Sequence, residues 1–473
     1  MHLRSPLVAS LALSLFVAPL ARAAEPTDLL SVRPTFFVGS DDVDRGAFTP
    51  SLHLGVTGRT RELAPGLTAQ VELSLDADAD LGLTDNSSYL RFDWRPSGWD
   101  DGQGLSFTVL PLHADRLYLG YAFPLTDLCG AYSSFASSSP RAPVTGLSLR
   151  LTRRAWYAFT AVKSTMKLNP LELESYRQYT VMVGGGLDLL PLLRVEAEGS
   201  HADLGLVPGD ANQGIRAPVD AWGAAARLLF HQGIPIGPPT DFERYQHDPG
   251  RWEEQLAPEA YDGGLSSSVS AEALSLSQHG LDGAVFGQPV NETSVGYALE
   301  GRVKWKKLRG FLRGQYRPAA LLWTDAPGLP PYKAISAAGT THGELSATAT
   351  ADWHFARTGL TPGLSFGVLR PASLESPVPP GGNNPPIGLV GRTVVFEDNH
   401  ALDLLPDGDS ALLNWVATAT LRWDLGQLSA LGEAFVRRNP NRTTFRDSAA
   451  GVAEPVYASA TQVGFDLLVQ LRF

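Results

Sequence analysis

Residues 345–353 read LSATATADW, and every second residue of this stretch is apolar. A helix would scatter the two residue types around its surface, whereas a β-strand sorts them onto opposite faces because its side chains alternate. The same period recurs at 67–76 (LTAQVELSLD) and at 193–198 (LRVEAE). The sequence therefore predicts an all-β protein built from strands with one apolar and one polar face.

Aromatic residues recur at a fixed spacing on the apolar face of three predicted strands. The pairs, each eight residues apart, are Tyr297 and Trp305, Trp415 and Trp423, and Phe465 and Phe473. Eight residues cover about 26 Å along a strand and about 20 Å of depth in a tilted strand, close to the roughly 25 Å apolar band between the aromatic girdles of a membrane barrel. The core of a soluble β-sandwich is the alternative. Three pairs at one spacing, with polar residues opposite them, favour apolar side chains facing lipid and polar ones facing a lumen.

Both ends of the chain carry features of exported proteins. Arg4 precedes an apolar run at 7–20, and Ala21-Arg22-Ala23 is typical of a cleavage site, so residues 1–23 are predicted to be a signal peptide. At the other end, the residues on one face of the last strand are Phe465, Leu467, Val469, Leu471 and Phe473.

This ending resembles the terminal strand of bacterial outer-membrane β-barrel proteins, the porin-like class, in which barrel-assembly machinery reads the last strand. The resemblance implies that residues 24–473 form one transmembrane antiparallel up-and-down β-barrel. It also implies a location in the outer membrane of a Gram-negative cell, with outer-membrane lipid around the barrel.

Nineteen segments carry the strand pattern. They are 33–40, 50–60, 67–77, 88–95, 104–111, 116–123, 144–151, 154–165, 178–188, 192–201, 219–230, 266–278, 295–305, 309–317, 342–355, 363–370, 413–423, 427–437 and 461–473. Bacterial single-chain barrels normally have an even number of strands, so we predict about 18, within a range of about 16 to 20, and expect 33–40 to drop out.

Two connections are unusually long. Residues 231–265 are predicted to be a non-strand insertion on the periplasmic side, which would form a docking element, a short helix, a lumen-folded constriction or a mobile loop. Residues 371–412 are predicted to be a Pro-rich loop.

Composition excludes several kinds of function. Removing residues 1–23 takes away Arg4 and Arg22 and lowers the formal charge from −11 to about −13, which gives no electrostatic reason to bind nucleic acid. No nucleophile–base pair or cofactor motif stands out, so we expect neither an enzyme nor a cofactor.

Asp76, Asp78 and Asp80 have spacing that suggests a calcium loop, but the EF-hand glycine and terminal glutamate are missing, and a solvated acidic loop is the alternative.

Charged side chains on the predicted lumen face are the candidate functional residues. They are Arg302, Lys304, Lys306, Arg309, Arg313, Arg317, Glu196, Glu198 and Arg422. The first six would line one wall if their two strands form a hairpin about Lys307, and such a wall would attract anions. The alternative is that lumen carboxylates pair with these cations and cancel the field.

The sequence therefore predicts an outer-membrane channel for passive diffusion of small hydrophilic solutes, anions among them. The alternative is a structural or docking barrel of an envelope machine for export, secretion or surface motility. In that case residues 231–265 would bind a periplasmic partner.

Overall fold

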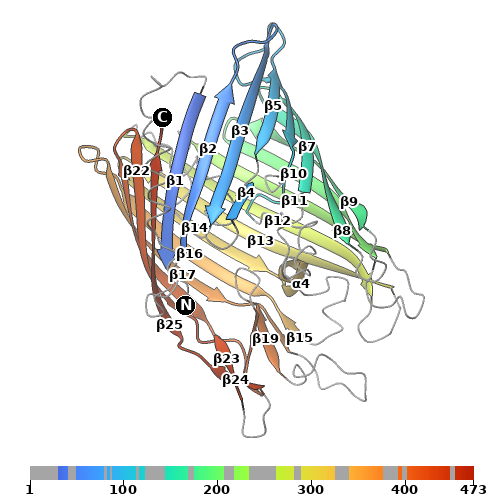
Figure 1. Cartoon of the computed structure of the whole chain (residues 1–473), viewed down its shortest axis with the longest axis vertical. Coiled ribbons are helices and arrows are strands. Elements are labelled where there is room, and N and C mark those ends of the chain that lie inside the picture. Colours follow the sequence, from blue (N-terminus) through green and yellow to red (C-terminus); the bar gives the residue numbers. More distant parts are fainter. Residues whose placement is uncertain are drawn as a thin grey trace.

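The computed structural model describes residues 30–40, 49–78, 82–85, 88–112, 117–122, 144–168, 175–206, 218–233, 263–281, 289–324, 340–375, 392–396, 402–447 and 453–473. These residues form a closed antiparallel barrel of 18 strands (Figure 1). The strands are β1 (Leu30–Ser40), β2 (Thr49–Arg59), β3 (Leu67–Asp78), β5 (Tyr89–Trp94), β6 (Gly104–Leu110), β7 (Val144–Thr152), β8 (Trp156–Leu168), β9 (Ser175–Leu190), β10 (Leu193–Leu206), β11 (Pro218–Gln232), β12 (Leu265–Leu281), β13 (Pro289–Trp305), β14 (Leu308–Arg317), β16 (Glu344–Trp353), β17 (Leu360–Arg370), β21 (Asn414–Asp424), β22 (Leu428–Arg438) and β25 (Thr461–Leu471). A short strand, β4 (Gly82–Asp85), pairs with the end of β3.

The first and last strands close the barrel. β1 pairs with β25 in the register Phe37↔Leu468, and the ladder continues past β25 because Val32 and Phe473 exchange two backbone hydrogen bonds of 3.0 Å. The expectation that 33–40 drops out is therefore wrong. Apolar residues occupy both faces of β1, with Phe36 exposed outside and Phe37 only 8% exposed inside, so this strand lacks the clean alternation of the others.

The predicted strand at 116–123 is also wrong, and this restores the even number. Residues 117–122 add no strand to the barrel and contact side chains on its inner wall. Their apolar character comes from packing inside the barrel, where Leu119 is buried.

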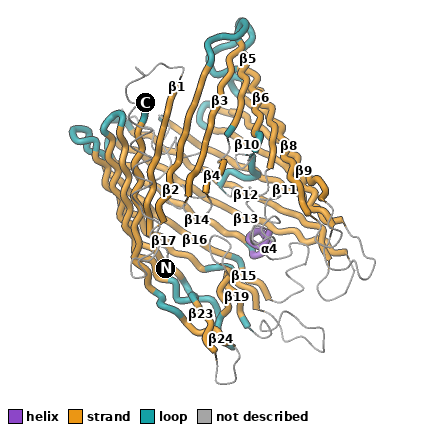
Figure 2. The backbone as a smooth tube through the Cα atoms, viewed as in Figure 1, coloured by secondary structure: helices purple, strands orange, loops and turns teal. Residues whose placement is uncertain are grey.

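With these two changes, successive connections lie alternately at the two ends of the barrel. We call the end of the barrel with the short turns, such as 191–192 and 306–307, the short-turn rim, and the opposite end the long-loop rim. The C-terminus lies at the short-turn rim, the upper rim in Figure 1, and the turns there are the teal tips in Figure 2. The long 233–264 connection also lies between two strand ends at the short-turn rim, the end of β11 at Gln232 and the start of β12 at Leu265. Residues 234–262 lie outside the described ranges.

The outer face of the barrel is apolar and carries two aromatic girdles. Toward the short-turn rim lie Trp94, Trp156, Trp305, Trp353 and Trp423; toward the long-loop rim lie Tyr179, Trp222, Tyr297 and Tyr316. These nine side chains are 39–55% exposed, whereas inward-facing polar residues such as Lys304 and Glu272 are at most 5% exposed. Apolar residues outside and polar residues inside a closed sheet define a transmembrane β-barrel of the outer-membrane type. Within the described ranges, no helix is long and apolar enough to cross a membrane.

The C-terminal residues follow the predicted faces. On β25 the even-numbered Asp466, Leu468 and Gln470 are buried inside, and odd-numbered Leu467 is 39% exposed outside. The recognition of this strand by assembly machinery stays a prediction.

The loops at the long-loop rim have structure of their own. β15 (Thr340–His342), β18 (Ser373–Glu375), β19 (Thr393–Phe396) and β20 (Leu402–Leu404) form a small sheet, and β23 (Thr443–Asp447) pairs with β24 (Ala453–Tyr457). Helix α4 (Ala319–Thr324), purple in Figure 2, contributes Ala319 to a core with Leu374 and Phe396. The region 371–412 is thus more than a Pro-rich loop, and its strands were missed because all four residues of β19 are buried and show no alternation.

Candidate functional site: the lumen and its inward segment

One stretch of chain between β6 and β7 lies inside the barrel. We call residues 117–122 the inward segment. Leu119 is 1% exposed and packs against Gly223 of β11, where an added Cβ would collide with the leucine side chain. Ala221 and Ala225, the neighbouring inward positions of β11, are small and buried as well. The small residues of this wall therefore make room for the inward segment.

Two carboxylates hold the backbone of the inward segment. The Tyr121 N–H donates to Glu272 Oε1 at 2.9 Å, and the Ala122 N–H donates to the other oxygen of the same carboxylate. The Gly120 N–H donates to Glu198 Oε1. Charge-assisted hydrogen bonds of this kind are about twice as strong as neutral ones. Three consecutive amides are thus fixed to β10 and β12.

Donors on β14 hold the segment from the other side. Arg313 Nη2 donates to the Ala122 carbonyl, and Gln315 Nε2 donates to the same oxygen at 3.3 Å. The inward segment therefore bridges side chains from β10, β12 and β14. Since it occupies space inside an 18-stranded barrel, it narrows a lumen that such barrels otherwise leave open to water.

Tyrosines and arginines alternate beside the inward segment. The guanidinium of Arg227 lies 4.3 Å from the centre of the Tyr121 ring, and its Nε donates to Glu196 Oε2 at 2.7 Å. Tyr157 donates to the other oxygen of Glu196 at 2.8 Å, and Arg150 lies 4.2 Å from the centre of the Tyr157 ring. Burial, followed by the negative charge of Glu198, raises the pKa of Tyr121 above its ordinary value.

The six cations predicted to form one wall do not form an uninterrupted cationic surface. Arg309 is only 3% exposed and makes a two-pronged ion pair with Asp352, with Nε to Oδ1 at 2.8 Å. Arg317 binds Glu344, with Nε to Oε1 at 2.7 Å.

Three more of the predicted cations belong to β13 or to the turn that follows it. Arg302 binds Glu300 at 2.5 Å, and Lys304 is buried opposite Arg309 in the β13–β14 register. Lys306 does not belong to the wall. It lies in the two-residue turn with a φ of 54°, and its Nζ lies 4.9 Å from the ring centre of Trp305, a residue of the outer girdle. The alternation does not continue to Lys306 because the turn begins one residue before Lys307.

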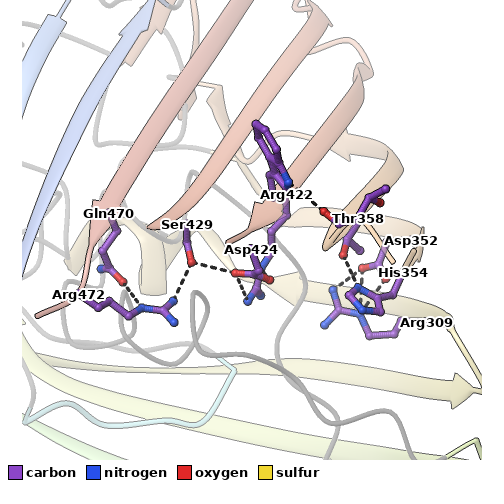
Figure 3. A network of polar contacts seen from close by, with 11 residues as sticks. Arg309, Asp352, His354, Thr358, Arg422, Asp424, Ser429, Gln470 and Arg472 are labelled. Atoms are coloured by element: carbon purple, nitrogen blue, oxygen red, sulfur yellow. Dashed lines mark hydrogen bonds and ion pairs between the residues drawn. The ribbon is translucent and has the colours of Figure 1, made fainter. Parts of the chain in front are cut away.

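Arg422 belongs to a chain of polar contacts at the short-turn rim, shown in Figure 3. Arg422 Nε donates to Asp424 Oδ2 at 2.9 Å, and Ser429 Oγ donates to Asp424 Oδ1 at 2.8 Å. Arg472 Nη2 donates to Ser429 Oγ at 3.1 Å, and Arg472 Nε donates to Gln470 Oε1 at 3.1 Å. Each polar side chain of this rim network therefore has a hydrogen-bonding partner.

His354 lies beside the same contacts in Figure 3, with Nδ1 3.0 Å from Thr361 Oγ1. Burial lowers the pKa of His354 below its ordinary value, although the nearby Asp424 carboxylate acts in the opposite direction.

The acidic calcium-like loop lies largely outside the described residues. The backbones of Asp76 and Asp78 belong to β3, but their side chains and the whole of Asp80 lie outside the described parts. Among the residues that are described, no group of three or more His, Cys, Asp or Glu could hold a metal ion.

Glu196 and Glu198 were predicted from the sequence, but Tyr121, Arg227 and Glu272 were not. The missed signal is a change of phase within β12. Its outward apolar residues are Val269, Ala271 and Ala273, and then Leu274 and Leu276 turn inward and are fully buried. Apolar residues on the lumen side of a barrel strand indicate that another part of the chain covers them.

No protein-family model matches the chain, and no curated protein matches it by sequence. Its fold is similar to solved structures that cover 94% of the chain. Pseudomonas aeruginosa OccK2 (OpdF) has a TM-score of 0.47 at 11% identity, with 96% of that chain covered. P. aeruginosa OpdL has a TM-score of 0.45 at 12% identity, and Acinetobacter baumannii OccAB2 has 0.46 at 9%, each with 97% of its chain covered. At these TM-scores and identities the likenesses support no conclusion about this chain's activity.

Proposed function

We propose that the protein is a porin-like channel of the outer membrane through which small hydrophilic solutes diffuse passively. One observation carries this proposal. An 18-stranded barrel with a polar inner wall is narrowed by an inward segment that Glu198, Glu272 and Arg313 hold against that wall. A fixed constriction inside a wide polar lumen separates solutes by size.

The proposal is tested by solute influx into liposomes. Purified protein is reconstituted, folding is checked by the mobility difference between unheated and boiled samples on a gel, and swelling is followed in solutions of neutral sugars of increasing size. The expected result is rapid swelling with monosaccharides and a sharp decline for larger oligosaccharides. Folded protein that gives no more swelling than protein-free liposomes would contradict the proposal.

We do not extend the proposal to a strong preference for anions. That expectation depended on six cations on one wall, and three of these, Arg302, Arg309 and Arg317, pair with carboxylates. Such a wall supports at most a weak preference for anions over cations.

A docking barrel is the second candidate, and the place of the 233–264 connection favours it. This long connection leaves from the short-turn rim, where barrels of this class have short periplasmic turns. Replacing residues 234–262 with a short Gly-Ser linker separates the two functions. A docking role requires that a periplasmic partner co-purifies with the full chain and is lost with the linker variant, while channel activity is unaffected.

A further inference from the structure

Arginine–carboxylate pairs occur on many strands of the inner wall. They are Arg91–Asp93, Arg194–Asp188, Arg227–Glu196, Arg302–Glu300, Arg309–Asp352, Arg317–Glu344 and Arg422–Asp424. Their members come from strands on both sides of the lumen, from β5 through β9 to β14 and on to β16 and β21. Charges of both signs therefore lie side by side at these places along the passage.

Among the described residues, four further charged groups contact the inward segment or the tyrosine beside it, two of each sign. Glu198 and Glu272 accept hydrogen bonds from neutral backbone amides. Arg313 donates to a backbone carbonyl, and Arg150 lies over the Tyr157 ring. Two negative and two positive groups with neutral partners thus stand at the narrow part of the lumen, and neither sign dominates.

A wall of this kind stabilises a permeating ion only weakly. The field of a close pair of opposite charges falls off faster than that of a single charge, and salt screens what remains over about 8 Å at physiological ionic strength. An ion that enters a narrow passage loses hydration water, and the free-energy cost of this loss is offset only if charges of the opposite sign line the passage.

A polyhydroxylated solute fits the same wall better. Each hydroxyl both donates and accepts, so it can bond to guanidinium N–H donors and to carboxylate oxygens that stand side by side. Carboxylates and guanidiniums keep spare hydrogen-bonding capacity after one contact, since a carboxylate offers about four acceptor sites and a guanidinium five N–H groups. The rings of Tyr121 and Tyr157 add partly exposed aromatic surface next to Glu196 and Arg227.

We infer that the channel favours small polyhydroxylated solutes without net charge, such as sugars and polyols, over anions and cations of the same size. This inference rests on the proposed channel function and names the solute class that the channel serves.

The test compares three solutes of nearly equal size in the liposome assay: glucose (uncharged), gluconate (anionic) and protonated glucosamine (cationic). Glucose is expected to enter severalfold faster than either ion, and the reversal potential in a potassium chloride gradient is expected to lie near zero. Gluconate entry at or above the glucose rate, or a reversal potential near the chloride or potassium limit, overturns the inference. Absence of swelling with every solute instead rejects the proposed channel, so the two failures are distinguishable.

Two variants test the cause. Glu344→Gln removes the carboxylate charge that pairs with the partly exposed Arg317, and Asp352→Asn removes the one that pairs with the buried Arg309. Each is expected to move the reversal potential toward chloride and to raise gluconate entry severalfold relative to glucose. Asp409→Asn removes the same charge at the long-loop rim, where Asp409 accepts a hydrogen bond from Tyr457, and is expected to change neither value. Unchanged selectivity in a correctly folded Glu344→Gln barrel overturns the inference even if Asp352→Asn fails to fold.

Discussion

Replacing Glu272 with glutamine should loosen the inward segment. The carboxylate accepts the N–H groups of Tyr121 and Ala122 on its two oxygens. Glutamine keeps one carbonyl oxygen, so one charge-assisted bond becomes neutral and the other is replaced by an unfavourable contact between two donors. Hydrogen bonds to charged groups contribute about 1.5–3 kcal/mol, so we expect a loss of about 2–4 kcal/mol. This loss changes the equilibrium constant between the wall-bound and the released inward segment by about 30- to 700-fold in favour of release.

The assay is single-channel recording in a planar bilayer, with neutral polymers of graded size to measure the exclusion limit. Glu272→Gln should increase the mean conductance or the open-channel noise and raise the exclusion limit, and Glu198→Gln/Glu272→Gln should do so more strongly. Glu344→Gln is the matched control, because it removes the same charge from the lumen without touching the inward segment. The reasoning is refuted if the double variant folds and its conductance, noise and exclusion limit equal those of the wild type.

Three further predictions follow from separate contacts. Gly223→Val should displace the Leu119 side chain and raise the polymer exclusion limit, which an unchanged limit in a folded variant would disprove. Deleting Phe473 removes the two backbone hydrogen bonds to Val32, so we expect less assembled barrel in cells on unheated gels; refolding the purified variant in detergent shows whether the defect lies in assembly or in stability. Burial raises the pKa of Tyr457 from 10.0 to about 12. The protonated Tyr457 side chain therefore contributes fully to the stability of the folded state below pH 10, and this contribution is lost as the pH rises through 12. Tyr457→Phe should therefore show a smaller fall in thermal stability over this range.

The strands were predictable because each has an apolar face toward lipid and a polar face toward the water-filled lumen. In β16 the alternation of residues 345–353 predicted both the strand and its faces, and the structure pairs these residues along their full length with β14. The lipid-facing aromatics Tyr297, Trp305 and Trp423 were predictable for the same reason.

The inward segment was not predictable from alternation. Residues 117–122 look like a strand because Leu119 needs apolar surroundings, and the sequence does not say whether lipid or a lumen wall supplies them. The pairing of the lumen charges was also open, since it depends on which residues meet across strands. Arg309 and Asp352 are 43 residues apart and become neighbours only through the β14–β16 register.

The proposed channel function requires that this barrel enclose an open passage. The most direct test is single-channel recording of the purified wild-type protein in a planar bilayer, with folding confirmed on unheated gels. The account predicts discrete and stable conductance steps that grow linearly with voltage and appear without any partner protein. A folded barrel that inserts into the bilayer and passes no current would contradict it.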